Sequence, residues 1–431
     1  MRVLLISPNR LRLVAPPLPL GLAGVAADVK LEHETQVLDL MFAEDPEAAV
    51  RQTVQEFKPD FICLSLRNID NQDSRHSQTY FPEVKKLIRL IRDLTPAPVL
   101  VGGSGFSIMP RQLMAYLGAD FGLIGEGEVN LRTFLRNWPG GGWRHCPGLI
   151  KQRDGAWQIN PVRLLDSLVG LPSPALELFN PRLYHEAQGT AKLPGMIPVQ
   201  SRRGCPMGCI YCTTPLLEGR RVRAWPPETV AARLAAWHEK WGLTRFYFVD
   251  SIFNHPLDYA RRLCQAIKDL HLPLEWSCII NPAFPDPQLF QLIREAGGVR
   301  VQVGNESGSE LVLRHLVKGF GLEQVKQTLN FLAAADLPYT CFLLLGGPGE
   351  TPDSVQESVA LLEAHKPLMV NLTVGVRIYP GLPLHRRALD EGLVQPGDEL
   401  LWPRFYLAPQ MRDWIWGYLE EVTERNPHWI F

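Results

Sequence analysis

The chain alternates short apolar runs with longer segments of helical periodicity, in two series separated by a stretch rich in proline and glycine. Short apolar runs with helices between them are typical of parallel strands, because a parallel connection needs a long crossover. The pattern therefore predicts an α/β fold in which helices cover parallel sheets. At roughly 150 residues per domain, 431 residues suffice for two or three domains.

The first series predicts a doubly wound, Rossmann-like domain over residues 1–136. Between two of its strands, residues 83–94 place Val84, Leu87, Ile88 and Ile91 at helical spacing. Its five strand-like runs are residues 2–7, 36–40, 59–66, 99–103 and 121–124.

The second series predicts a partial (β/α)6 barrel of the TIM type over residues 195–395. A Pro/Gly-rich connector over residues 137–194 precedes it, with at most a small hairpin around Asp154-Gly155. An aromatic-rich, helical tail follows over residues 396–431, and we expect its helix at residues 409–425. The six strand-like runs begin near Ile197, Arg245, Leu274, Val299, Tyr339 and Met369. The chemistry of such a barrel belongs at the carboxyl ends of its strands.

Charge and composition narrow the class of protein. The 44 Lys and Arg nearly balance the 45 Asp and Glu, so no global field favours nucleic acid or anionic lipid. The first residues carry an apolar run too short for a signal peptide, and no stretch predicts a transmembrane segment. We therefore expect a cytoplasmic protein that does not bind nucleic acid. Eight cysteines are too few for a disulfide scaffold.

Three of those cysteines crowd into one loop after the first barrel strand, as Cys205-x3-Cys209-x2-Cys212. Three thiolates on one loop can ligate three irons of a [4Fe-4S] cluster, which leaves one iron open, as catalytic metal sites do. Arg202 and Arg203 precede the loop and are placed to offset the negative charge of such a cluster. The alternative is zinc, but the sequence offers no second close-spaced pair of ligands.

The cysteine loop, with Tyr211 before its last cysteine, resembles the signature of the radical S-adenosylmethionine (SAM) superfamily. The resemblance implies that the open iron binds the amino and carboxylate groups of SAM. One electron, from a donor such as a flavodoxin or ferredoxin, then cleaves SAM to a 5′-deoxyadenosyl radical that abstracts hydrogen from the substrate.

Four further strand ends resemble SAM-contacting segments of that family. Asp250 ends the second strand, Glu306 ends the fourth and Gly346-Gly347 follows the fifth. Arg377 and Tyr379 follow the sixth and resemble a wall for adenine. Structural roles remain open for each of them, because acidic residues also cap helices and Pro348-Gly349-Glu350-Thr351 also suits a turn into a helix.

Doubly wound domains bind ligands at the carboxyl edge of their sheet, which here involves the loops after the first, third and fourth strands. These segments closely resemble the cobalamin-binding domain that precedes the barrel in the cobalamin-dependent branch of the family, so the resemblance covers nearly the whole chain. The contacts it implies are Ser65, Leu66, Arg67, Asn68, Gly102, Gly103, Ser104, Gly125 and Glu126.

The loop after the first strand departs from other cobalamin-binding domains. Those carry Asp-x-His-x-x-Gly, whose His ligates cobalt, whereas this chain reads Ser7-Pro8-Asn9-Arg10-Leu11-Arg12 and offers no His. The resemblance implies cobalamin with its own base displaced and no protein histidine below cobalt, with Arg67 a candidate to lie beneath the corrin. The alternatives are that Arg67 is an exposed loop residue, or that the domain has lost cobalamin and serves as a lid.

The expected cofactors are thus a [4Fe-4S] cluster, SAM and cobalamin, and the resemblance implies methyl transfer from SAM through methylcobalamin to an unactivated carbon. Two alternatives remain: a rearrangement, cyclisation or oxidation without methylation, or a non-catalytic sensor or carrier. The sequence does not choose among small-molecule, lipid and peptide substrates. His76, His185, His255 and His315 are isolated and receive no role.

Overall fold

The computed structural model describes all residues except 13–14, 139, 154 and 189–193, and the chain forms two compact units. The first comprises Met1–Asn71, Gln78–Ile197 and Leu216–Gly219, and the second comprises Gln72–Ser77, Pro198–Pro215 and Arg220–Phe431. Each holds a sheet of seven strands. The division of the sequence at residues 136, 194 and 395 remains a prediction.

Five parallel strands form the centre of the first sheet, in the order β2-β1-β3-β4-β5. They are β1 (Arg2–Ser7), β2 (Glu34–Asp39), β3 (Phe61–Ser65), β4 (Val99–Gly102) and β5 (Phe121–Leu123). All five lie at the predicted segments, with β2 beginning two residues early. The doubly wound fold is confirmed, and its strand order reverses between β1 and β3.

Two antiparallel strands extend this sheet beyond β5: β6 (Leu149–Arg153) and β7 (Ala156–Ile159). They form the small hairpin predicted around Asp154-Gly155, although Asp154 itself lies outside the described residues. The segment predicted as an extended connector thus contributes to the sheet, because β6 pairs with the open edge of β5 through Leu123 and Leu149.

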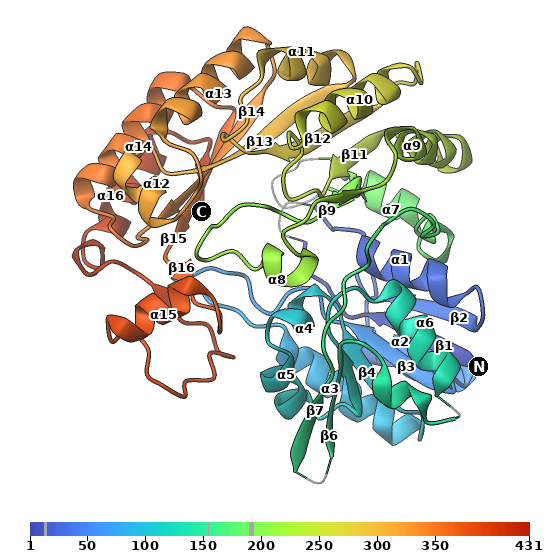
Figure 1. The fold of residues 1–431 in the computed structure, drawn as a ribbon. Helices are drawn as coiled ribbons and strands as arrows, with labels where there is room; N and C mark the ends of the chain where they lie inside the picture. The colour runs from blue at the N-terminus through green and yellow to red at the C-terminus, as the bar shows by residue number, and fades with distance from the viewer. Residues whose placement is uncertain (13–14, 139, 154, 189–193) are drawn as a thin grey trace. The chain divides into compact units, whose positions relative to one another are not determined.

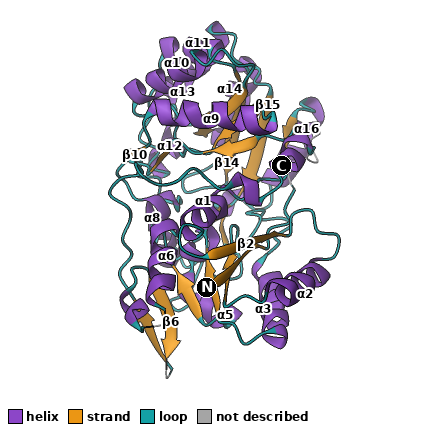
Figure 2. Cartoon of the chain, turned by 90° about the vertical axis from the view of Figure 1, so that its right-hand side faces the viewer, coloured by secondary structure: helices purple, strands orange, loops and turns teal. Residues whose placement is uncertain are grey.

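Helices cover both faces of the first sheet. Helix α1 packs on α6, while α2 packs on α3 and α3 on α5. Figure 2 shows α1 and α6 on one side of the strands and α2 and α3 on the other. The predicted apolar face of α3 is buried. The helices are α1 (Leu20–Val29), α2 (Pro46–Phe57), α3 (Phe81–Leu94), α4 (Ser104–Ile108), α5 (Pro110–Leu117), α6 (Glu128–Asn137) and α7 (Pro181–Glu186).

The second sheet is parallel, in the order β18-β15-β14-β13-β12-β11-β8. All six predicted strands are present, as β8 (Ile197–Val199), β11 (Arg245–Phe248), β12 (Glu275–Ile280), β13 (Gly298–Glu306), β14 (Tyr339–Leu345) and β15 (Met369–Val374). Figure 1 shows the covering helices from α9, in green, to α14, in orange. They are α9 (Pro227–Trp241), α10 (Leu257–Lys268), α11 (Pro287–Glu295), α12 (Glu310–His315), α13 (Leu322–Ala334) and α14 (Pro352–His365).

The C-terminal segment differs from its prediction in two respects. Its helix, α16 (Ile415–Arg425), begins six residues later than expected, because Pro409–Met411 forms a separate 3-10 turn. The chain then adds β18 (Trp429–Ile430), a seventh strand parallel to β15. A strand of two residues has no periodicity from which it could be predicted. Along the described part of the chain, no helix is both long and apolar enough to cross a bilayer.

Candidate functional site

The cysteine loop leaves the second sheet after β8 and the short strand β9 (Arg202–Arg203), which pairs with β10 (Arg223–Ala224). Gly204 opens the loop with a φ of +100°, and a Cβ there would lie 2.2 Å from the Arg221 carbonyl oxygen. Only glycine fits this position, because any side chain would clash with the backbone of Arg221, just before β10. The loop therefore departs from β9 in a fixed direction.

The middle of the loop is anchored by backbone hydrogen bonds on both sides. The Ile210 N–H donates to the Leu316 carbonyl (3.2 Å), and the Ile210 carbonyl accepts from the Leu384 N–H (3.1 Å). Cys205 is buried, whereas Cys209 and Cys212 are partly exposed. The loop thus carries its three cysteines on a backbone held by hydrogen bonds.

The three thiols of this loop form a donor set that suits a [4Fe-4S] cluster. Among the described residues, no three His, Cys, Asp or Glu side chains converge closely enough to hold one metal ion. In a [4Fe-4S] cluster each thiolate ligates its own iron, so three thiols on one loop suit three of the four irons. Burial raises the pKa of the Cys209 thiol, and the Lys318 ammonium acts in the opposite direction.

Lys318, which the sequence analysis missed, lies beside this loop. Its ammonium donates to the Tyr211 hydroxyl (3.1 Å) and to the Glu306 carboxylate (3.3 Å), and the residue is only 4% exposed. Burial alone would lower the pKa of Lys318, but the adjacent Glu306 carboxylate raises it above its usual value. A lone lysine after a helix gives no sequence signal, because Tyr211 lies 107 positions away.

The predicted SAM-contacting residues gather at one edge of the second sheet. Glu306 ends β13, Gly346 and Gly347 follow β14, and Arg377 lies in β16 (Val376–Arg377) just after β15. Because β13, β14 and β15 are parallel neighbours, these positions lie side by side at the carboxyl edge. Glu306 has a φ of +63°, a strained conformation of the kind that clusters at ligand sites.

Asp250 binds the backbone at the start of the cysteine loop. It is fully buried, and one carboxylate oxygen accepts from the backbone N–H groups of Ser201 (2.8 Å) and Arg202 (3.1 Å). The other oxygen accepts from the Ser201 hydroxyl and lies 3.4 Å from the Arg202 Nε. Asp250 therefore fixes the start of the cysteine loop. The charge of Arg202, expected to offset the cluster, is paired with Asp250.

Arg377 is also engaged within the protein. Its guanidinium donates to the carbonyls of Ile378 (2.6 Å) and Leu400 (2.9 Å) and lies over the Tyr379 ring, 4.8 Å from its centroid. Both residues are buried. They bind the C-terminal segment to the end of β15, and a direct contact of either with adenine stays a prediction.

Glu350, in the turn after β14, should make stability depend on pH. Its side chain is fully buried, and its carboxylate accepts from the Gly346 N–H (3.2 Å) and the Ser354 hydroxyl (3.1 Å). These hydrogen bonds lower the pKa of Glu350, but burial outweighs them and raises it to about 7. The folded chain thus binds one proton more than the unfolded chain between about pH 4.5 and 7, so the free energy of unfolding falls by about 3 kcal/mol as pH rises through that window.

Denaturant unfolding of the wild type and of Glu350→Gln at pH 5 and pH 7.5 checks this. The variant should lose that part of the pH dependence, because its amide does not ionise. Equal pH slopes in both proteins would show that Glu350 is not the group responsible.

In the first unit, the loops after β3 and β4 are joined at the carboxyl edge of the sheet. The Leu66 N–H donates to the Gly102 carbonyl (2.8 Å), the Gly105 N–H to the Leu66 carbonyl (3.0 Å), and the Ser104 hydroxyl to the Arg67 carbonyl (3.0 Å). The predicted contacts Ser65, Leu66, Arg67, Asn68, Gly102, Gly103 and Ser104 therefore lie together. Arg67 is exposed.

Gly125 and Glu126 follow β5 and adjoin the same loops. The Gly125 N–H donates to the Ser107 hydroxyl oxygen (2.9 Å). Glu126 is buried, and its carboxylate accepts from the Leu165 N–H (2.6 Å). In this structure Glu126 holds the segment after β7 to the sheet, and its contact with cobalamin remains a prediction.

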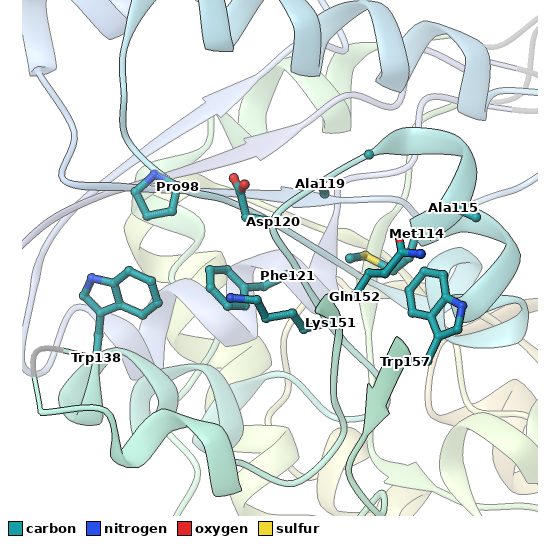
Figure 3. A pocket seen from close by; sticks show the side chains of 11 residues that line it. Pro98, Met114, Ala115, Ala119, Asp120, Phe121, Trp138, Lys151, Gln152 and Trp157 are labelled. Carbon is teal, nitrogen blue, oxygen red and sulfur yellow. The ribbon is translucent and has the colours of Figure 1, made fainter. Parts of the chain in front are cut away.

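A cavity of about 460 Å³ lies elsewhere in the first unit (Figure 3). Pro98 and Asp120 directly precede β4 and β5, so the cavity adjoins the amino ends of these strands, opposite the predicted cobalamin edge. Asp120 accepts from the Val99 N–H (2.8 Å) and pairs with Arg92, and the Lys151 ammonium lies over the Phe121 ring. These polar groups are thus occupied within the protein.

Comparisons with known proteins agree with both units. The radical SAM superfamily model matches residues 199–362, and the B12 binding domain model matches residues 11–135. One relative is cytidylyl-2-hydroxyethylphosphonate methyltransferase from Streptomyces wedmorensis. The two sequences are 24% identical, and the alignment covers 93% of this chain and 84% of the relative. Another, anaerobic magnesium-protoporphyrin IX monomethyl ester cyclase from Rubrivivax gelatinosus, is 22% identical over 86% of this chain and 67% of its own.

The fold also matches a solved structure along its whole length. The radical SAM methyltransferase TsrM from Kitasatospora setae, with cobalamin and a [4Fe-4S] cluster bound, superposes with a TM-score of 0.84 at 20% identity, covering 100% of this chain and 90% of that one. Fold and site define a radical SAM enzyme that carries a second, B12-binding domain. The two matched domains bear out the predicted resemblance to cobalamin-dependent radical SAM enzymes, and the cofactors are a [4Fe-4S] cluster, SAM and cobalamin, as the sequence predicts.

Proposed function

We propose that the protein is a methyltransferase that moves a methyl group from SAM, by way of cobalamin, to an unactivated carbon of its substrate. The observation that carries this proposal is the presence in one chain of a B12-binding domain and a radical SAM domain, each built on a sheet with parallel central strands. The methyltransferase relatives support it, since the relative from Streptomyces and TsrM both match the chain over both domains.

In this proposal, Cys205, Cys209 and Cys212 hold the cluster, and Gly204 and Ile210 fix the loop that carries them. When bound, the cluster supplies the electron that cleaves SAM, and cobalamin supplies a carrier for the methyl group. The protein's own part is to bind and orient the reactants and to exclude water from them.

The SAM site is proposed at the carboxyl edge of the second sheet. Tyr211 and Glu306 contribute polar groups, and Gly346 and Gly347 allow the ligand to approach the backbone closely. The site is also stabilised by Asp250, which accepts a hydrogen bond from Ser201 before the cysteine loop. Arg377, beside Tyr379, donates to the Leu400 carbonyl in the C-terminal segment.

The cobalamin site is proposed over the joined loops after β3 and β4. The loop after β1 contains no His, so we propose that no histidine of this loop would ligate cobalt. Arg67, which is exposed on the loop after β3, would contact the corrin without ligating cobalt, because a protonated guanidinium has no lone pair to donate.

The substrate is proposed to be a small molecule, a lipid or a peptide, and the reducing electrons to come from a protein such as a flavodoxin or ferredoxin. We propose that the reaction takes place in the cytoplasm, where thiols stay reduced.

Isotope transfer tests the function without knowledge of the substrate. The reduced protein, loaded with cluster and cobalamin, is given SAM labelled in its methyl group, and the cobalamin is then extracted. Methyl label on the extracted cobalamin, with S-adenosylhomocysteine as co-product, is the expected result. Formation of 5′-deoxyadenosine without transfer of label would instead support the ring-forming or oxidative alternative, which the cyclase relative favours. No SAM turnover would point to a sensor or carrier.

A further inference from the structure

The strongest unassigned feature of the second unit is the turn at residues 316–319, between α12 and α13. It touches the cysteine loop at successive positions. The Leu316 carbonyl accepts from the Ile210 N–H, and a Cβ on Gly208 would lie 3.3 Å from a methyl group of Val317. The Met207 methyl would lie 2.7 Å from a Cβ on Gly319. The turn therefore follows the loop closely, with Lys318 at its centre.

Lys318 links two segments that come from different strand ends. Its ammonium bonds to Tyr211 on the cysteine loop and to Glu306 at the end of β13, while the residue is almost fully buried. It also lies over the rings of Tyr211 (5.6 Å) and Phe320 (5.5 Å). A buried charge is costly unless it is paired and hydrogen-bonded, so this ammonium is held by specific partners rather than by solvent.

The backbone is strained at Glu306 and at the residue before Lys318. Glu306 has a φ of +63° and Val317, directly before Lys318, has a φ of +54°, although neither is glycine. Non-glycine residues persist in this conformation only where surrounding structure over-determines them, and such residues cluster at ligand clamps. The strain therefore indicates that the relative position of Glu306 and Lys318 is fixed by the fold.

We propose that Lys318 is a positioning residue for SAM: its ammonium holds the Glu306 carboxylate and the Tyr211 hydroxyl in the orientation that receives SAM beside the cluster. This inference rests on the proposed location of the SAM site and names a residue that completes it. Without the ammonium, the Glu306 carboxylate loses its partner and the hydroxyl of Tyr211 loses its donor, so the site must reorganise before SAM binds.

The test uses full-length protein with its cluster reconstituted under anaerobic conditions, and SAM is the probe. In Lys318→Met, which keeps the length but removes the charge, we expect the dissociation constant for SAM to rise about tenfold, the lower limit of what removing a partner from a buried charged hydrogen bond costs. The iron and sulfide content should stay at the wild-type level. Lys318→Arg should recover part of the affinity because it restores a cation. Lys326→Met, an exposed lysine on α13, is the matched control.

A double-mutant cycle separates positioning from general packing. If Lys318 acts through Glu306, then Lys318→Met should weaken SAM binding much less in a Glu306→Gln background than in the wild type, since residues in contact are not additive. Unchanged SAM affinity in Lys318→Met, or loss of iron in proportion to loss of affinity, would overturn the proposal. Wild-type protein that carries the cluster but binds no SAM would instead overturn the proposed function.

Discussion

Cys209→Ala is expected to lose most of the iron of the reconstituted protein and at least about a hundredfold of its SAM cleavage, more than is typical for residues that only orient metal ligands. Cys209 is one of three thiols on the anchored loop, and the two thiols that remain cannot hold three irons. Iron and sulfide counts, with the absorption of the cluster, measure the outcome.

Cys264→Ala is the matched control for that experiment. Cys264 is also a free cysteine, but it is fully buried in α10 and is not part of the cysteine loop. Its replacement therefore removes only packing contacts. Full iron content in Cys209→Ala, or equal losses in both variants, would contradict the assignment of the cluster to this loop.

Gly103→Ala should weaken cobalamin binding by about tenfold or more while leaving the cluster intact. Gly103 has a φ of +99°, and an added Cβ would lie 2.6 Å from the Leu66 carbonyl oxygen. That oxygen accepts from the Gly105 N–H, so the methyl group forces apart the joined loops of the proposed cobalamin site. A displacement costing about 1.4 kcal/mol corresponds to a tenfold change in affinity.

The control for Gly103→Ala is Gly170→Ala. Gly170 also has a positive φ, +92°, but a Cβ there would meet nothing within 4 Å. Both variants place alanine at a positive φ that L side chains rarely adopt, and only Gly103→Ala also carries the clash with the Leu66 carbonyl oxygen. Equilibrium dialysis with cobalamin distinguishes them. Equal cobalamin affinity in both variants would show that the loops after β3 and β4 do not form the site.

Elements with strong local signals were predictable from the sequence. The buried strands β1 and β14 are runs of apolar residues, and α3 shows regular helical spacing, so each was found at or near its observed place. The cysteine loop was also predictable, because its spacing is local and its chemistry is specific. By contrast, the pairing of β6 with β5 depends on an open sheet edge, which no local pattern reveals.

The roles of individual charged residues were harder to predict. Asp250 and Arg377 stand at strand ends, as expected, but their charges are used within the protein, by Ser201 and by the Leu400 carbonyl. Position along a strand is a local property, whereas hydrogen-bond partners depend on which distant segments pack there. Lys318 shows the same limit, since its partners lie 12 and 107 positions away.

The second sheet also bears on how this protein behaves in concentrated solution. Its two edges are its shortest strands: β8 spans three residues and β18 two, whereas β13 in the interior spans nine. An edge strand has unpaired N–H and carbonyl groups that can pair with an extended segment of another molecule. Very short edge strands are one way in which proteins limit such pairing. The sheet is therefore built to resist edge-to-edge aggregation between molecules, even though its long apolar strands have high intrinsic β-propensity.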